Sequence, residues 1–257
     1  MVQFHDWCDI ANGNVGAHPL LLMSGDPARL NAGVAATAAI VPTHYAAEER
    51  VAGILRRLGK PAAAQFVEGK LPTSKSIRSG DLGEILATEW IASQGNYQVP
   101  IKRLRWKDHR NMAMRGDDVI GIHHDPHANA LFFLKTEAKS RVTLNAAVLS
   151  EARAGLDKDG GLPSAHALSF IADRLADLGN DVLSDAILDA QLKHGIPAQS
   201  VRHLTFILSG NNPRPHLAGS LGAYAGGIAQ SSVGLRIEGH AAFVAAVYDL
   251  VIANANN

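Results

Sequence analysis

Residues 115–141 read RGDDVIGIHHDPHANALFFLKTEAKSR, and the fold prediction starts from this stretch. Its first part, 118–123, is rich in β-branched side chains, whereas 124–129 collects the Asp, Pro and Asn that are typical of turns. Residues 131–139 are again mostly apolar. The order of strand, turn and strand predicts a β-hairpin.

Two acids and one lysine give this hairpin its predicted chemistry. Side chains alternate between the faces of a strand, so Glu137 and Lys139 share one face, and the hairpin can bring Asp118 near both. Burying an unpaired charge costs several kcal/mol, which a divalent cation offsets. Carboxylate oxygens suit Mg²⁺, and an ammonium group can orient a water molecule or neutralise a phosphate. These residues therefore favour metal-assisted phosphodiester cleavage.

The same residues resemble a known signature. Asp118 followed by Glu137-Ala138-Lys139 resembles the D…(D/E)-x-K motif of PD-(D/E)xK nucleases, and Gly83-Glu84 resembles their upstream helical glutamate. The chain also resembles the HamA family, the nuclease subunits of Hachiman-type anti-phage defence. That resemblance extends roughly from residue 55 to 255, through GDLGEILATEW, the basic run at 100–115, RGDDVIGIHH, FFLKTEAKS and GLRIEGHAAFVAAVYDLV.

The resemblance implies a fold, a mechanism and a partner. The fold is a restriction-endonuclease-like α/β core with a mixed sheet flanked by helices. Asp118, Glu137 and the carbonyl of Ala138 would bind Mg²⁺ or Mn²⁺, Glu84 would hold the site directly or through water, and Lys139 would position the attacking water. A separate HamB-like helicase subunit would sense DNA and restrain the nuclease, because this chain has no P-loop of its own.

Two assignments stay open at this point. Asp117 is an alternative to Asp118, and only the Gly-x-Asp spacing of the family separates them. Glu84 has the spacing of a capping box with Asp81, which is a purely structural role. Glu89 is its rival for the site, because it lies on the apolar stripe of the predicted helix.

Weaker candidates surround these residues. A zinc interpretation lacks a cysteine and suitable ligand spacing, so a polar turn is favoured for His123, His124 and His127. Further polar residues follow the second strand, although an exposed helix face accounts for Glu151 equally well. They are Ser140, Arg141 and Glu151.

A basic run precedes the hairpin. The formal net charge of the chain is +0, so any DNA affinity must come from a local cluster. Between residues 99 and 115 the cations face one acid, Asp108, with Trp106 among them, and such a run can neutralise phosphates and stack a base. The alternative is a solvated face. The predicted DNA-binding residues are Lys102, Arg103, Arg105, Lys107, Arg110 and Arg115.

Composition and patterning complete the prediction. With 257 residues, 47% of them hydrophobic, the chain can bury a sizeable core, and its single cysteine, Cys8, suits a reducing cytoplasm. No signal peptide or membrane-length apolar run is visible. We predict an N-terminal segment of uncertain role, possibly in partner docking (1–70), and a nuclease domain (71–257). The alternative function is a catalytically inactive DNA-binding or interaction subunit with the same fold.

The pattern predicts the following elements. Strands are expected at 99–106, 117–123, 131–139, 201–208 and 233–237, with a further short one at 20–23. Helices are expected at 45–58, 81–94, 145–156, 164–178, 180–193 and 240–253, and loops at 72–79 and 209–231.

Overall fold

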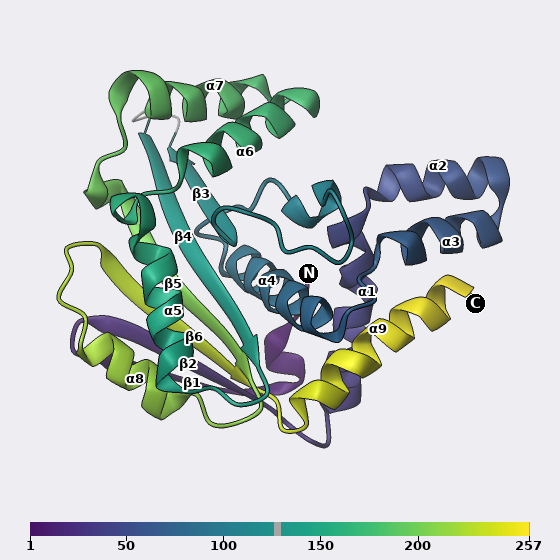
Figure 1. The fold of residues 1–257 in the computed structure, drawn as a ribbon, viewed down its shortest axis with the longest axis horizontal. Helices are drawn as coiled ribbons and strands as arrows, with labels where there is room; N and C mark the ends of the chain where they lie inside the picture. Colours follow the sequence, from purple (N-terminus) through teal and green to yellow (C-terminus); the bar gives the residue numbers. More distant parts are fainter. Residues whose placement is uncertain (126–129, 257) are drawn as a thin grey trace.

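A mixed β-sheet forms the centre of the computed structural model, which describes residues 1–125 and 130–256 (Figure 1). In order across the sheet, its six strands are β1 (Cys8–Val15), β2 (His18–Gly25), β6 (Ala229–Arg236), β5 (Val201–Ser209), β4 (Ala130–Arg141) and β3 (Val119–Asp125). β2, β6, β5 and β4 are parallel neighbours, and antiparallel hairpins add β1 and β3 at the edges. The predicted α/β class with a mixed sheet is confirmed, and the sheet is consistent with a restriction-endonuclease-like core.

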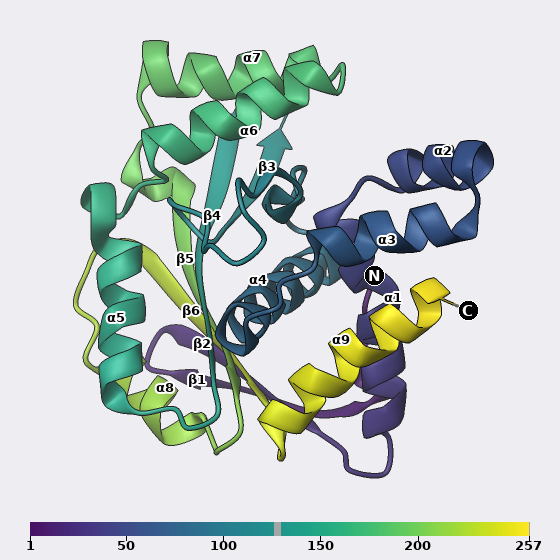
Figure 2. The same cartoon turned by 45° about the vertical axis from the view of Figure 1, so that its right-hand side comes forward.

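Helices cover both faces of the sheet (Figures 1 and 2). α1, α4 and α9 pack on one face, and α5 and α8 pack on the other. α6 and α7 form a pair beside β3 and β4, whereas α2 and α3 form an arm that projects from the body. The bounds are α1 (Leu30–Tyr45), α2 (Glu48–Leu58), α3 (Lys60–Lys70), α4 (Lys75–Gln94), α5 (Ala146–Asp157), α6 (Ala165–Asp177), α7 (Asp181–Asp189), α8 (Arg214–Gly222) and α9 (His240–Asn256).

The N-terminal residues join the main core. β2 pairs with β6, and the indole of Trp7 stacks on Phe243 of α9 with ring centroids 5.8 Å apart. Gly33 of α1 allows this packing, because a Cβ there would lie 2.4 Å from the Trp7 ring. The docking role for residues 1–70 stays a prediction. Across the described residues, no helix is both long and apolar enough for a membrane span.

The predicted strand at 99–106 is wrong. Residues Arg103–Trp106 form a 3-10 turn, and Gln98 makes an isolated bridge to Ile122. Ile101 and Leu104 are both buried, three positions apart, which suits a 3-10 turn and not the alternation of a strand.

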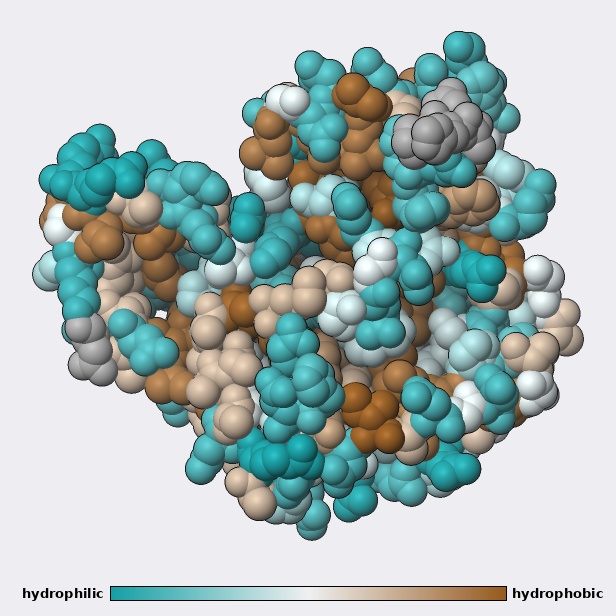
Figure 3. Space-filling view, turned by 180° about the vertical axis from the view of Figure 1, so that it is seen from behind, coloured by the Kyte–Doolittle hydropathy of each residue, from teal (hydrophilic) through white to brown (hydrophobic). Residues whose placement is uncertain are grey.

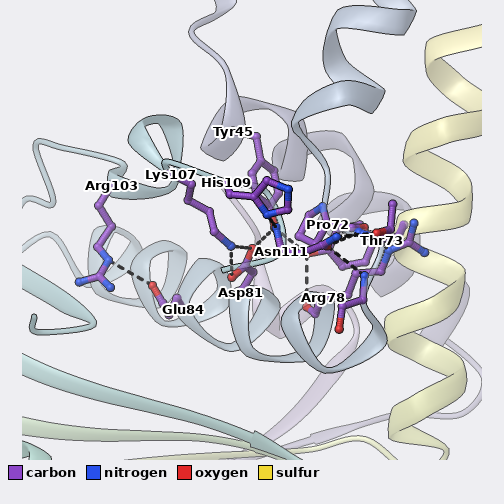
Figure 4. A network of polar contacts seen from close by, with 12 residues as sticks. Tyr45, Pro72, Thr73, Arg78, Asp81, Glu84, Arg103, Lys107, His109 and Asn111 are labelled. Atoms are coloured by element: carbon purple, nitrogen blue, oxygen red, sulfur yellow. Dashed lines mark hydrogen bonds and ion pairs between the residues drawn. The ribbon is translucent and has the colours of Figure 1, made fainter. Parts of the chain in front are cut away.

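The predicted loop at 72–79 is only partly a loop. α4 begins at Lys75, and the two residues just before it are held from a distant position. The Asn111 side-chain oxygen accepts hydrogen bonds from the N–H groups of Thr73 and Ser74, at 2.8 and 3.1 Å (Figure 4). Because a contact from thirty-seven residues away leaves no local pattern, the sequence did not indicate this start.

The predicted long loop at 209–231 is also wrong. α8 and the first residues of β6 lie within it. Leu217 and Leu221, four positions apart, are both buried, so one face of this short helix packs on the sheet. Gly234 of β6 allows the close approach, because a Cβ there would lie 2.7 Å from the ring of Pro213.

Candidate active site

The candidate site lies where β3 stops pairing with β4. The two strands pair only as far as Val119 opposite Thr136, so residues 137–141 of β4 lie beyond the end of β3. Asp118 stands just before this point, and its Oδ2 accepts a hydrogen bond from the Ala138 N–H at 2.9 Å. A side chain thereby continues the hydrogen bonding where the backbone ladder ends. This contact brings Asp118 beside the second strand, as the hairpin predicts.

Glu137 and Lys139 share one face of β4. Lys139 Nζ lies 2.5 Å from Glu137 Oε1. The Glu137 side chain is 14% exposed and the Lys139 side chain is 20% exposed. The Glu137 carboxylate also lies against α5, where a Cβ added to Gly155 would come within 2.5 Å of Oε2. The glycine therefore leaves the room that this carboxylate occupies, a role that the sequence did not indicate.

Gly155→Ala should gain less stability than the about 0.5–1 kcal/mol that Gly to Ala normally gives inside a helix. The added methyl group would overlap the Glu137 carboxylate, and this flexible side chain would have to leave its place beside Lys139 to make room. The measurement is urea unfolding, with Gly53→Ala in α2 as a matched control, since a Cβ there meets nothing within 4 Å. Equal gains in stability from both substitutions would contradict the packing described here.

Glu84 approaches the site from α4. Gly83 lets this helix sit close to β4, because a Cβ there would lie 3.2 Å from the Cβ of Ser140. Glu84 Oε2 is buried without a hydrogen bond and lies 3.4 Å from Arg103 Nε (Figure 4). Since α4 begins at Lys75, Glu84 is not in the first turn and cannot form the capping box that its spacing with Asp81 suggests.

Burial disfavours the charged form of all three acids of the site. Burial raises the pKa of Glu84 to about 8, against the nearby Arg103 and with the help of the Asp118 charge. Burial also raises the pKa of Asp118, although Lys139 opposes this. The pKa of Glu137 is raised by burial and then by Asp118. The Asp118 charge thus raises the pKa of both glutamates, and a bound cation would relieve this repulsion.

The raised pKa of Glu84 predicts that stability falls as the pH rises from about 4.5 to about 8. The folded state keeps a proton that the unfolded chain releases above a pKa of 4.5, so stability falls until the pH passes about 8. The slope is at most about 1.4 kcal/mol per pH unit for one group. Urea unfolding at about pH 7 and about pH 8.5 should show a smaller decline for Glu84→Gln than for the unaltered protein. Equal declines would contradict the assignment of the raised pKa to Glu84.

Asp117 is fixed by other parts of the structure. Its Oδ2 accepts a hydrogen bond from the Ser164 N–H at 2.8 Å, and its Oδ1 lies 3.4 Å from Nζ of the fully buried Lys135. Its carbonyl accepts a hydrogen bond from Arg103. Asp117 therefore anchors the start of α6, and Asp118 is the better candidate for the site.

Glu89 is also occupied elsewhere. It is buried and accepts hydrogen bonds from His44 at 2.9 Å and from the Val2 N–H at 3.2 Å, with Lys102 3.6 Å away. Burial alone would raise the pKa of Glu89, but the hydrogen bond and charge of His44, with the Lys102 charge, lower it to about 2. Glu89 thus ties the N-terminus to α1 and α4, which leaves Glu84 as the glutamate near Asp118.

Most of the predicted DNA-binding cations turn inward. Lys102 donates to Thr43 Oγ1 at 2.7 Å, and Arg105 donates to the Thr43 carbonyl at 2.9 Å. Arg103 and Lys107 pair with acids of α4, Glu84 and Asp81 (Figure 4). Two members of the predicted set do not form such inward contacts among the described residues. They are the half-buried Arg110 and the exposed Arg115.

The Lys107 pair belongs to a buried network. Lys107 Nζ lies 2.7 Å from Asp81 Oδ2, which also accepts a hydrogen bond from Tyr45 at 2.7 Å. The hydroxyl groups of Tyr45 and Tyr248 are 2.8 Å apart. The network joins the 103–111 segment to α1, α4 and α9, so it holds that segment over the helix that carries Glu84 (Figure 4).

The second group of polar candidates lies beside the site. Ser140 is buried, and its Oγ is 2.8 Å from both Ser79 Oγ and His240 Nε2. Arg141 and Glu151 form an exposed pair 3.9 Å apart. Ser140 therefore joins β4 to α4 and α9, whereas Glu151 lies on an exposed helix face.

The histidines near the turn lie apart from this cluster. His123 is exposed and contacts the rings of Tyr97 and Phe132, and His124 is half-buried. His127 lies outside the described residues. Within residues 1–125 and 130–256, no group of three or more His, Cys, Asp or Glu side chains is arranged to hold a metal ion.

The donor atoms at the site are nevertheless of the chemical type that binds a divalent cation. Asp118, Glu137 and the Ala138 carbonyl are hard oxygen donors, and Mg²⁺ commonly combines one or two carboxylates with water. Glu84 Oε2 is a buried oxygen without a hydrogen bond. Glu84 and Asp118 both line a cavity of about 60 Å³, which has room for a few water molecules or an ion.

Comparison with known proteins agrees with the sequence resemblance. Over 183 residues the chain is 29% identical to "Hachiman protein HamA" of Bacillus cereus. The alignment covers 71% of this chain and 64% of that protein, so it spans less than two thirds of the relative's length. A model of the HamA family matches residues 1–251. The match includes nearly the whole chain, and the protein therefore belongs to the HamA family.

Proposed function

We propose that this protein is a metal-dependent DNA nuclease of the PD-(D/E)xK type that acts in anti-phage defence. The observation that carries the proposal is the crowding of Asp118, Glu137 and Glu84, whose pKa values are all raised, beside Lys139. The defence role rests on the relative named for the Hachiman system. Crowded acids beside a lysine at the end of a strand suit phosphodiester hydrolysis better than a purely structural role.

In this proposal each residue has a defined task. Asp118, Glu137 and the Ala138 carbonyl would hold Mg²⁺ or Mn²⁺, which when bound supplies positive charge to the phosphate and lowers the pKa of a water molecule. Lys139 lies against Glu137 and can hydrogen-bond the attacking water or a phosphate oxygen. Glu84 closes the site from α4 and keeps a proton or a water in place there.

The direct test is incubation of the purified protein with supercoiled plasmid. Cleavage with Mg²⁺ or Mn²⁺ and none with EDTA is the expected result. Nicked or linear product in EDTA would contradict a metal-dependent reaction.

One observation favours a second function, that of an inactive interaction subunit. Arg103 pairs with Glu84, and Lys139 pairs with Glu137, so two acids are already partly neutralised by the protein's own cations. Such a subunit would bind DNA or a partner without turnover. Binding of plasmid without cleavage under any metal condition would favour this alternative.

We also propose that a helicase subunit restrains the nuclease. A nuclease that does not read a base sequence would endanger the host genome, and this chain has no P-loop with which to drive a motor. We expect co-expression with a neighbouring helicase gene to give one complex in size-exclusion chromatography, with less cleavage than the free chain. Separate elution and equal cleavage would contradict regulation by this partner.

A further inference from the structure

A groove runs between α3 and the segment 104–110, outside the candidate active site. Its volume is about 450 Å³. One wall is α3, and the other is the segment that the buried network holds over α4. The side chains that matter for binding are Phe66, Lys70, Arg105, Lys107, His109 and Arg110.

Two cations of this groove are free to meet an anion. Lys70 and Arg110 form no ion pair with any residue in the described part of the chain. The acid that lines the groove is Asp108, which is exposed. Arg105 and Lys107 have internal partners, so they fix the wall. Asp81 neutralises Lys107, whereas Arg105 donates to a neutral carbonyl and keeps its positive charge. The groove therefore combines a fixed wall with two adaptable cations.

An aromatic ring of the groove lies beside one of these cations. Phe66 is half-buried, and the Lys70 ammonium lies 5.9 Å from the centre of its ring. Because the lysine stem is flexible, the ammonium can turn to a phosphate and leave the ring to a planar partner. An aromatic ring in a groove lined by cations can stack a nucleic-acid base while the cations neutralise its backbone.

Further cations lie on the α2–α3 arm, which also carries the exposed acids Glu48 and Glu49. Four of the cations are exposed and, within the described residues, form no ion pair; they are Arg50, Arg56, Arg57 and Lys60. Figure 3 shows the arm standing apart from the body, with hydrophilic residues over its tip. A strand leaving the groove on this side would meet further phosphate-binding groups.

We propose that this groove binds a single strand of DNA, with Lys70 and Arg110 on the phosphates and Phe66 stacked on a base. In a duplex the bases are paired and stacked inside, so a duplex could offer its phosphates but no base face to Phe66. The segment 103–110 also carries Arg103, which contacts Glu84, so one segment connects the groove to the active site. This inference rests on the proposed nuclease function and specifies the form of its substrate.

The test measures fluorescence anisotropy of a labelled dT oligonucleotide of about 12 nucleotides, and of a duplex of equal length, with the full chain in EDTA. We expect the single strand to bind more tightly. Lys70→Glu and Arg110→Glu should each weaken single-strand binding about tenfold and flatten its salt dependence. Phe66→Leu should weaken single-strand binding about tenfold and leave duplex binding unchanged. Arg214→Glu, the same charge change at the exposed start of α8, is the matched control.

Thermal melting of each variant shows whether it is folded. If Phe66→Leu is unstable, the Lys70→Glu and Arg110→Glu variants still test the proposal. Single-strand affinities equal to that of Arg214→Glu would overturn the proposal. Loss of helicase co-elution with unchanged DNA affinity would also overturn it and assign the groove to a protein.

Failure of the groove can be told apart from failure of the nuclease function. Glu137→Gln, which alters a proposed metal ligand, should lose cleavage and, in EDTA, keep the groove-dependent affinity for the oligonucleotide. A protein that cleaves plasmid but binds the oligonucleotide independently of the groove cations refutes only the groove. A protein that binds through the groove but never cleaves refutes only the nuclease.

Discussion

Lys139→Ala and Glu137→Gln are each expected to lower metal-dependent cleavage of plasmid by about 10³-fold or more, with the melting temperature almost unchanged. Glu137→Gln removes an anionic metal ligand of the proposed site, and Lys139→Ala removes the donor that would position the attacking water. Both side chains lie beyond the end of β3 and not in an apolar core cluster, so their loss removes little packing. The measurement is the initial rate of supercoiled plasmid loss in Mg²⁺ and in Mn²⁺.

Matched controls are available on the surface for both changes. Glu238→Gln alters a carboxylate that is 81% exposed, and Lys193→Ala removes an ammonium from a side chain that is 67% exposed. Both controls should cleave at the rate of the unaltered protein. A folded Lys139→Ala variant with full activity would refute the assignment of this site.

Asp117→Ala is expected to destabilise the protein by about 3–5 kcal/mol, because it leaves a buried ammonium without its carboxylate. The Lys135 side chain is 1% exposed and donates hydrogen bonds to the carbonyls of Lys158 and Leu162, which are neutral. Asp117 also accepts a hydrogen bond from the N–H of Ser164, the N-cap residue of α6. Urea unfolding measures the loss, and Asp117→Ala combined with Lys135→Met should recover a large part of it.

Asp118→Asn is the matched comparison for this change. This substitution keeps the shape of the side chain and removes a carboxylate that burial disfavours, as its raised pKa shows. The free energy of unfolding should therefore stay equal or increase. Similar stability losses from Asp117→Ala and Asp118→Asn would contradict the separation of a structural and a functional aspartate.

The elements with regular apolar patterns could be predicted from the sequence. The β3–β4 hairpin, β5 and the helices from α5 to α7 lie close to their predicted positions, because each buries one face with a strand or helix period. β1 could not be predicted. It reads CDIANGNV, and six of its eight residues are exposed, so it is an edge strand defined by its pairing with β2.

The contents of the site could be predicted better than its geometry. Spacing predicted that Asp118, Glu137 and Lys139 lie close together, as they do in the structure, because a hairpin and strand alternation are local properties. The choice between Asp117 and Asp118 depends on Lys135 and Ser164, which lie elsewhere in the chain. No local pattern contains that information.

The basic run shows the same limit. Its cations are visible in the sequence, but whether each faces water depends on acceptors from distant helices. Thr43 of α1 and Asp81 of α4 take up Lys102, Arg105 and Lys107. Local composition therefore indicated charge without indicating where the charge points.

In the proposed mechanism Asp118 and Glu137 hold a divalent cation, and titration calorimetry with Mn²⁺ measures this binding. We expect the unaltered protein to bind Mn²⁺, and Asp118→Asn and Glu137→Gln to bind it at least tenfold more weakly. Glu238→Gln, on the surface, should bind it as the unaltered protein does. Equal Mn²⁺ affinity in all four proteins would contradict a metal site at these residues.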